Sequence, residues 1–251
     1  MNLIEDSLRS AWQLMASLDA QLLSIVGRSL AVSGLACLLA CSLGLWLGAW
    51  LAVQRFAGRP ALLAVLNTSL ALPSVLVGLV LYLLLSRSGP LGFLGWLFSF
   101  KAMVLAQTIL VLPVVVALVR QQVEDADRAH GEQLQSLGAG PKVRALLLLW
   151  DERHALVTIA VAAFGRAISE VGAVMVVGGN IEGFTRVMTT AIALETSKGD
   201  LPLALALGLV LLGVVLLLHG LMALLSSWHR RSGAGQGAHA LAAPGWSKGR
   251  E

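Results

Sequence analysis

The feature that most constrains this chain is the spacing of its charged residues, which leaves long stretches with none. Four stretches of 18 to 29 residues contain no Lys, Arg, Asp or Glu, although the whole chain has only 251 residues. A helix needs about 20 apolar residues to cross the ~30 Å hydrocarbon core of a bilayer. The stretches are residues 29–54, 60–86, 102–119 and 201–229. The sequence therefore predicts an all-α integral membrane protein.

A fifth apolar stretch contains two charges, Arg166 and Glu170. Ionisable side chains inside a span cost about 2.5–3.5 kcal/mol each on the insertion scale, so they normally face protein or water. The two residues are spaced i,i+4, on one face of a helix, where they can neutralise each other. We therefore expect five transmembrane helices. They cover about residues 29–53, 61–85, 102–119, 155–178 and 201–226.

The segments outside the spans differ in composition. Residues 1–28 place apolar side chains at helical spacing, which predicts an amphipathic N-terminal segment on the membrane surface. Residues 120–153 form a polar interior segment in which Gly138 and Pro141 separate two helices. This helix-turn-helix is either a docking surface or an ordinary solvated connector. Residues 230–251 are rich in Gly, Ala and Ser, so we expect a disordered tail.

The net charge of +4 reflects membrane topology rather than nucleic-acid binding. With the N-terminus outside and the C-terminus inside, five spans place eleven Lys and Arg residues in inner segments and six in outer segments. This bias follows the positive-inside rule. The six Phe, seven Trp and one Tyr are too few and too scattered for a base-stacking surface. We expect a multi-pass protein in contact with the lipid bilayer, with no nucleic-acid partner.

The first span carries a stripe of small residues that predicts helix packing, because small side chains let two helices approach closely. Its members are Ser33, Cys37, Cys41, Gly44 and Gly48. Ser33 with His219 of the last span would suit an intramembrane hydrolase, but nothing places the two side chains together. We therefore expect Ser33 to serve packing and His219 to hydrogen-bond a neighbouring helix.

A loop rich in Gly, Asn and Thr follows the fourth span. Glycine leaves backbone N–H groups free to turn inward, and Thr and Arg side chains add donors, which suits a tetrahedral oxyanion. For the charged pair we favour packing and gating over direct contact with substrate. The candidate pathway and gating residues are Arg166, Ser169, Glu170, Gly179, Asn180, Thr185, Arg186, Thr189 and Thr190. No Gly-x-x-x-x-Gly-Lys-Ser/Thr phosphate loop and no His-Glu-x-x-His motif occurs.

Two stretches resemble known permeases. In the polar interior segment, Glu132 and Gly138 keep the spacing of the cytoplasmic coupling loop of type I ABC importer permeases, with Gln133 and Leu134 in place of two alanines. Residues 166–200 are similar to tungstate-type permeases, because they contain Arg-Ala-Ile-Ser-Glu-Val-Gly-Ala and then Gly-Gly-Asn-Ile. Molybdate and sulfate permeases share a looser form, with Gly-Glu-Phe-Gly-Ala and Ala-Gly-Asn-Ile. The resemblance in span order covers residues 22–228.

This resemblance implies the permease subunit of an ATP-driven, binding-protein-dependent oxyanion importer, for tungstate first and for molybdate or sulfate as alternatives. It implies a second copy of the chain, a dimer of separate ABC ATPase subunits that bind ATP and Mg, and an extracytoplasmic oxyanion-binding protein. It also implies a bacterial or archaeal cytoplasmic (inner) membrane. We expect no catalytic residue, cofactor or metal on this chain. The implied ATPase-coupling residues are Glu132, Leu137, Gly138, Ala139 and Gly140.

An alternative hypothesis, from a different functional class, is a stand-alone secondary transporter in which Arg166 and Glu170 relay protons. Such transporters are built from paired repeats with broken helices at matching positions. The sequence shows no convincing internal repeat, and five spans do not divide into equal halves. The importer permease is therefore the favoured hypothesis.

Overall fold

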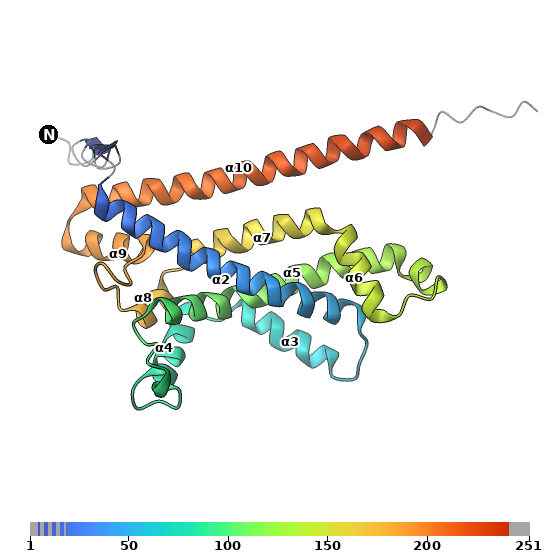
Figure 1. Cartoon of the computed structure of the whole chain (residues 1–251), viewed down its shortest axis with the longest axis horizontal. Coiled ribbons are helices and arrows are strands. Elements are labelled where there is room, and N and C mark those ends of the chain that lie inside the picture. The colour runs from blue at the N-terminus through green and yellow to red at the C-terminus, as the bar shows by residue number, and fades with distance from the viewer. Residues whose placement is uncertain (1–4, 6–7, 10–11, 14–15, 18, 241–251) are drawn as a thin grey trace, which may run out of the picture.

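The computed structural model describes residues 5, 8–9, 12–13, 16–17 and 19–240. In this part of the chain the regular structure is helical, with no strand, which confirms the predicted all-α fold class (Figure 1). The helices are α2 (Ala20–Val53), α3 (Arg59–Leu70), α4 (Ser74–Leu85), the 3-10 turn η1 (Gly92–Leu94), α5 (Phe100–Ser136), α6 (Pro141–Asp151), α7 (Arg153–Ile168), α8 (Gly172–Gly178), α9 (Met188–Lys198) and α10 (Leu201–Ala240).

Three of the described helices, α2, α5 and α10, are long and apolar enough to cross a membrane alone. The pairs α3–α4 and α7–α8 qualify only as broken spans, bent by 101° and 57°. The structure therefore contains the five expected spans when each bent pair is counted as one span. Pro73 accounts for the first break, because it precedes α4 directly and has no N–H to continue the α3 ladder.

The centre of the bundle is the contact between α2 and α5, which run side by side (Figure 1). Gly44 and Gly48 of the small-residue stripe lie in this contact, whereas Cys37 of the stripe contacts the Ala160 carbonyl of α7. A Cβ added at Gly44 would lie 2.6 Å from Val115 Cγ1, and one added at Gly48 would lie 2.8 Å from Val119 Cβ. The two helices approach so closely that only glycine fits, which confirms the predicted packing role.

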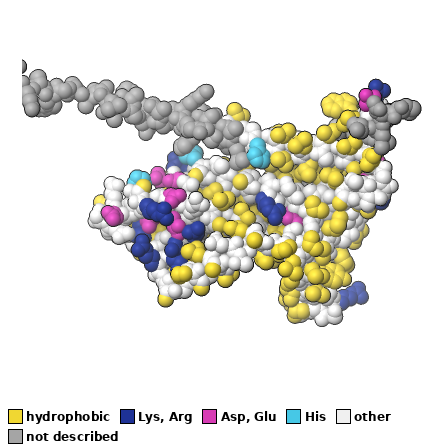
Figure 2. Space-filling model, turned by 180° about the vertical axis from the view of Figure 1, so that it is seen from behind, with side chains coloured by type: hydrophobic (Ala, Val, Ile, Leu, Met, Phe, Trp, Pro, Cys, Tyr) yellow, Lys and Arg dark blue, Asp and Glu magenta, His cyan; other side chains and the backbone are white. Residues whose placement is uncertain are grey.

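The surface separates apolar from charged side chains. Figure 2 shows hydrophobic side chains spread over much of the molecule, whereas most charged side chains gather at one end. Leu38, Leu83 and Leu217 are all more than half exposed. Apolar surface this extensive is stable only against lipid or protein, so the structure is that of a multi-pass membrane protein.

Two segment boundaries differ from the expectation. The predicted N-terminal segment 1–28 lies partly outside the described residues, but residues 20–28 belong to α2, whose first turn Asp19 caps by accepting from Gln21 N at 2.9 Å. The tail was expected to be disordered from residue 230, whereas α10 continues to Ala240. Extending an existing helix requires no new nucleation, which lets even a Gly-rich segment continue it. Residues 241–251 lie outside the described residues.

Candidate functional site

The first part of the site is the break between α7 and α8. Arg166 Nη1 donates to Glu170 Oε2 at 2.9 Å, as the i,i+4 spacing predicted. The carboxylate is buried, with its side chain 5% exposed, whereas the guanidinium side chain is 46% exposed. The second carboxylate oxygen accepts from the backbone N of Ala173 at 3.2 Å. Glu170, which lies directly before the N-cap residue Val171, therefore satisfies one free backbone N–H in the first turn of α8.

Two neighbouring helices, α5 and α9, donate hydrogen bonds to the backbone at the break. Gln107 Nε2 of α5 donates to the carbonyl of Ala167 at 3.0 Å, and Thr189 Oγ1 of α9 donates to the carbonyl of Glu170 at 2.7 Å. A helix can break at membrane depth only where neighbours satisfy the freed backbone groups. These hydrogen bonds therefore stabilise the break within the bundle.

The exposed side of this break presents donors. Arg166 uses one donor nitrogen on Glu170, and a guanidinium carries five N–H groups in all. Ser169 is also exposed, and its hydroxyl donates to the carbonyl of Gly165 at 2.9 Å. The guanidinium thus remains able to bind an anion while the buried carboxylate fixes its position.

The second part of the site is the loop between α8 and α9. Thr185 Oγ1 donates to the carbonyl of Gly178 and accepts from Ile181 N at 2.9 Å. Thr190 Oγ1 accepts from Val187 N at 3.1 Å. Asn180 Nδ2 donates to the carbonyl of Thr190 at 3.2 Å.

These groups shape the loop by bonding its own backbone. Gly179 and Asn180 take left-handed φ angles of 69° and 49°, which turn the chain sharply after α8. The predicted residues Gly179, Asn180, Thr185 and Thr190 are therefore brought together in one turn. Thr189 instead lies at the α7–α8 break through its bond to Glu170. A pathway role for these five residues stays a prediction.

Arg186 is buried next to the same loop. Its guanidinium lies 3.7 Å from Glu195 and 3.4 Å from Glu182, and Glu195 also pairs with Lys198 at 3.1 Å. Arg28 of α2 donates to the Arg186 carbonyl at 3.0 Å and to the Gly183 carbonyl at 2.7 Å. The loop is thereby attached to the first long helix. In the sequence, the signal for Arg28 is a lone Arg at the start of an apolar stretch, and it was not among the predicted site residues.

The third part of the site is the turn between α5 and α6, at the far end of the molecule from the loop after α8 (Figure 1). Gly138 has a φ of +83°, which favours glycine, and Leu137 beside it is 77% exposed. Glu132 and Gly140 are exposed as well, and Ala139 is half-buried. All five residues implied as ATPase-coupling residues thus lie on one protruding turn or on the helix that leads into it.

An ion-pair network supports this turn. Glu124 of α5 binds both Arg59 of α3 and Arg120, the latter at 2.8 Å, and Asp127 of α5 binds Arg144 of α6 at 2.9 Å. The network connects α3, α5 and α6 close to their polar ends. This network was not predicted, and its only signal in the sequence is the i,i+4 spacing of Arg120 and Glu124.

The alternative hydrolase site is not assembled. His219 Nδ1 hydrogen-bonds the carbonyl of Val215 in its own helix at 2.8 Å, so the expected bond to a neighbouring helix is wrong. An i−4 carbonyl is within reach of any such side chain and needs no partner helix. Ser33 is buried in α2, as expected for packing. Among the described residues, no group of three or more His, Cys, Asp and Glu side chains is placed to hold a metal ion.

Comparison with known proteins gives several relatives over most of the chain. The tungstate uptake system permease protein TupB of Campylobacter jejuni is 41% identical over 212 residues, which are 84% of this chain and 89% of that protein. The probable anion ABC transporter permease protein of Haloferax volcanii is 42% identical over 78% of this chain and 86% of its own length. The molybdenum transport system permease protein ModB of Escherichia coli is 33% identical over 68% and 80%, respectively. No family model matches the chain.

Proposed function

Because the chain belongs to the family of tungstate, molybdate and sulfate ABC transporter permeases, we propose that it forms the membrane pathway of a tungstate importer. Two relatives named as tungstate uptake permeases share 41% and 39% identity with it, whereas a molybdenum permease shares 33%. The tungstate-type pattern at Ser169-Glu170-Val171-Gly172 supports the same choice.

The observation that carries this proposal is the exposed guanidinium of Arg166 inside a broken span. Facing lipid there would cost about 2.5–3.5 kcal/mol or more, so this face of α7 meets water or another protein surface. A cation at the wall of a water-filled pathway attracts a tetrahedral dianion such as tungstate, and its ion pair with Glu170 keeps the attraction weak enough for release.

The proposed assembly contains two copies of this chain with the pathway between them, so that the Arg166 face of each copy borders it. A dimer of ABC ATPase subunits, which bind ATP and Mg, docks on the exposed turn at Gly138. An extracytoplasmic binding protein delivers the oxyanion on the opposite side. The N-terminus then lies outside and the C-terminus inside the cytoplasmic membrane. The ion pairs of Glu124 and Asp127 support this assignment, because they attach the docking turn firmly to α3 and α6.

The test is ATP hydrolysis by the assembled transporter in liposomes. The chain is co-purified with the ATPase and binding protein, and rates are compared with tungstate, molybdate and sulfate on the binding protein. We expect the strongest stimulation with tungstate. Gly138→Asp should abolish it, because Gly138 needs a left-handed φ, whereas the control Gly208→Ala in α10, where nothing lies within 4 Å of the added Cβ, should retain it. Oxyanion movement by the chain alone along a proton gradient would instead support the secondary transporter.

The pathway is tested separately through Ser169. With Cys37 and Cys41 replaced by Ala, Ser169→Cys places one thiol on the exposed side of the break. An anionic, membrane-impermeant thiosulfonate reacts with it if this face meets water, since only a solvated thiol ionises. Cys placed at exposed, lipid-facing Leu38 is the matched control and should not react. Equal reaction at both positions contradicts the proposed pathway.

A further inference from the structure

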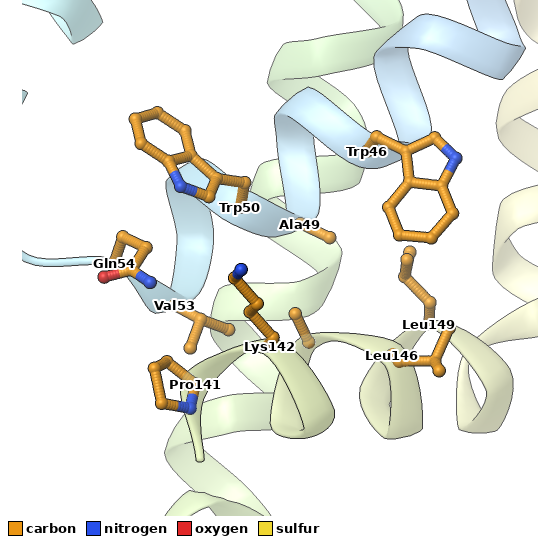
Figure 3. Close-up of a pocket in the computed structure, with 10 residues that line it drawn as sticks. Trp46, Ala49, Trp50, Val53, Gln54, Pro141, Lys142, Leu146 and Leu149 are labelled. Carbon is orange, nitrogen blue, oxygen red and sulfur yellow. The ribbon is translucent and has the colours of Figure 1, made fainter.

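A cavity of about 280 Å³ lies between the end of α2 and the helix α6, directly after the Gly138 turn (Figure 3). Ala49 and Val53 form its α2 wall, and Ala145, Leu146 and Leu149 form its α6 wall. Its lining is therefore almost entirely apolar, although it lies at the end of the bundle where the charged residues gather. An apolar cavity at this boundary suits a hydrocarbon chain better than a hydrophilic solute.

One cation stands at this cavity. Lys142 lies in the first turn of α6, and Figure 3 shows its side chain pointing toward the end of α2, which carries Trp50 and Val53. The described ion pairs leave Lys142 unpaired, because the carboxylates of Glu124 and Asp127 bind arginines instead. No side chain caps the first turn of α6, so the positive end of that helix is open as well.

The cavity continues a lipid-facing surface. Leu39, Leu43, Trp46 and Trp50 are all exposed and follow one another at spacings of four, three and four residues, so they form one stripe along α2. Trp46 is 67% exposed, and indoles are enriched where the hydrocarbon core meets the headgroups. An acyl chain that lies along this stripe leads directly into the cavity.

We propose that this cavity binds a phospholipid with an anionic headgroup, whose phosphate pairs with Lys142 while one acyl chain fills the apolar groove. Basic pockets at the cytoplasmic ends of spanning helices select anionic lipids in this way. The stem of Lys142 joins the apolar wall, and its ammonium reaches the headgroup level. The lipid would fix α6 against α2, so it would stiffen the segment that follows the Gly138 turn. The proposal rests on the proposed orientation, with α6 on the cytoplasmic side, and it holds whichever oxyanion is transported.

The test measures lipids retained by the purified full-length chain, alone and with its ATPase. Native mass spectrometry compares phosphatidylglycerol with phosphatidylcholine of the same acyl chains. We expect the anionic lipid to bind about fivefold more tightly, the factor that one lysine near a headgroup provides. Lys142→Gln should remove this preference. Arg128→Gln, which removes an exposed charge from the same segment, should keep it.

A second variant tests the groove itself. Ala145→Phe places an aromatic ring in the cavity and should lower retention of both lipids. If this variant folds poorly, Lys142→Gln still tests the proposal. The proposal is overturned if Lys142→Gln keeps the full preference, or if Ala145→Phe folds and binds lipid like the unaltered chain. It is also overturned if adding the ATPase releases the lipid, or if cysteines at Trp46 cross-link two copies of the chain, because a protein is then the occupant.

Discussion

The contact between α2 and α5 yields a sharp prediction, because two glycines of one helix differ in what surrounds them. In Gly48→Ala the new Cβ would lie 2.8 Å from both Cβ and Cγ1 of Val119 and 3.0 Å from the backbone oxygen of Val116. In Gly34→Ala the nearest heavy atom is Phe164 Cε2 at 3.9 Å, an ordinary contact. The first substitution overpacks the helix contact, and the second does not.

The magnitude follows from comparing the two variants. Both replace a helical glycine by alanine, which favours the helix by about 0.5–1 kcal/mol, so this gain cancels in the comparison. Overpacking a close contact costs about 1–3 kcal/mol, and here backbone as well as side chain has to move. Gly48→Ala should therefore be less stable than Gly34→Ala by about 1–3 kcal/mol. For a chain of this size each kcal/mol corresponds to about 2–4 °C in Tm.

The assay is thermal unfolding in one detergent, followed by tryptophan fluorescence. We expect Gly34→Ala to match or exceed the unaltered chain, and Gly48→Ala to melt several degrees below Gly34→Ala. Gly44→Ala should resemble Gly48→Ala, since its Cβ would lie 2.6 Å from Val115 Cγ1. Equal Tm values for the variants at positions 34 and 48 would refute the close approach of α2 and α5.

Three further predictions concern the polar contacts. Arg166→Gln should lower Tm more than Glu170→Gln does, because it leaves a buried carboxylate without its cation, at about 1–3 kcal/mol. Gln107→Leu should cost about 0.5–1.5 kcal/mol, because it removes one hydrogen bond to the Ala167 carbonyl, which keeps its bond from Glu170 N; thermal unfolding measures this, and an unchanged Tm would contradict the bracing role. Glu124→Gln should speed hydrogen exchange in α3, read by mass spectrometry, while exchange in α9 stays constant.

The sequence was sufficient for features set by local spacing. Stretches without charge located the membrane-crossing segments, since burying a charge in lipid is costly whatever the neighbours are. The i,i+4 positions of Arg166 and Glu170 fixed their pairing, and the spacing of Gly44 and Gly48 fixed a packing face. Each of these depends on one helix alone, so it could be predicted before the arrangement of the helices was known.

Features that depend on two distant segments could not be predicted. Nothing in the sequence says that Gln107 meets Ala167, or that Arg28 meets the loop at Gly183, because both contacts require knowing which helices are neighbours. The break after α7 leaves backbone groups without helical partners. Thr189 donates a hydrogen bond to one of these groups, the Glu170 carbonyl. No residue pattern in the sequence reveals this contact.

The length of α5 has a mechanical consequence. Its 37 residues form one helix of about 56 Å, nearly twice the ~30 Å hydrocarbon core, with Pro113 inside it. Gln107 near one end braces the broken span, and Asp127 near the other end holds α6. A tilt of the whole helix by about 10° about its midpoint displaces each end by about 5 Å. A bend at Pro113, which has no N–H for the i−4 carbonyl, moves one end alone. The α7–α8 break and the Gly138 turn are therefore linked through one helix that contains a proline.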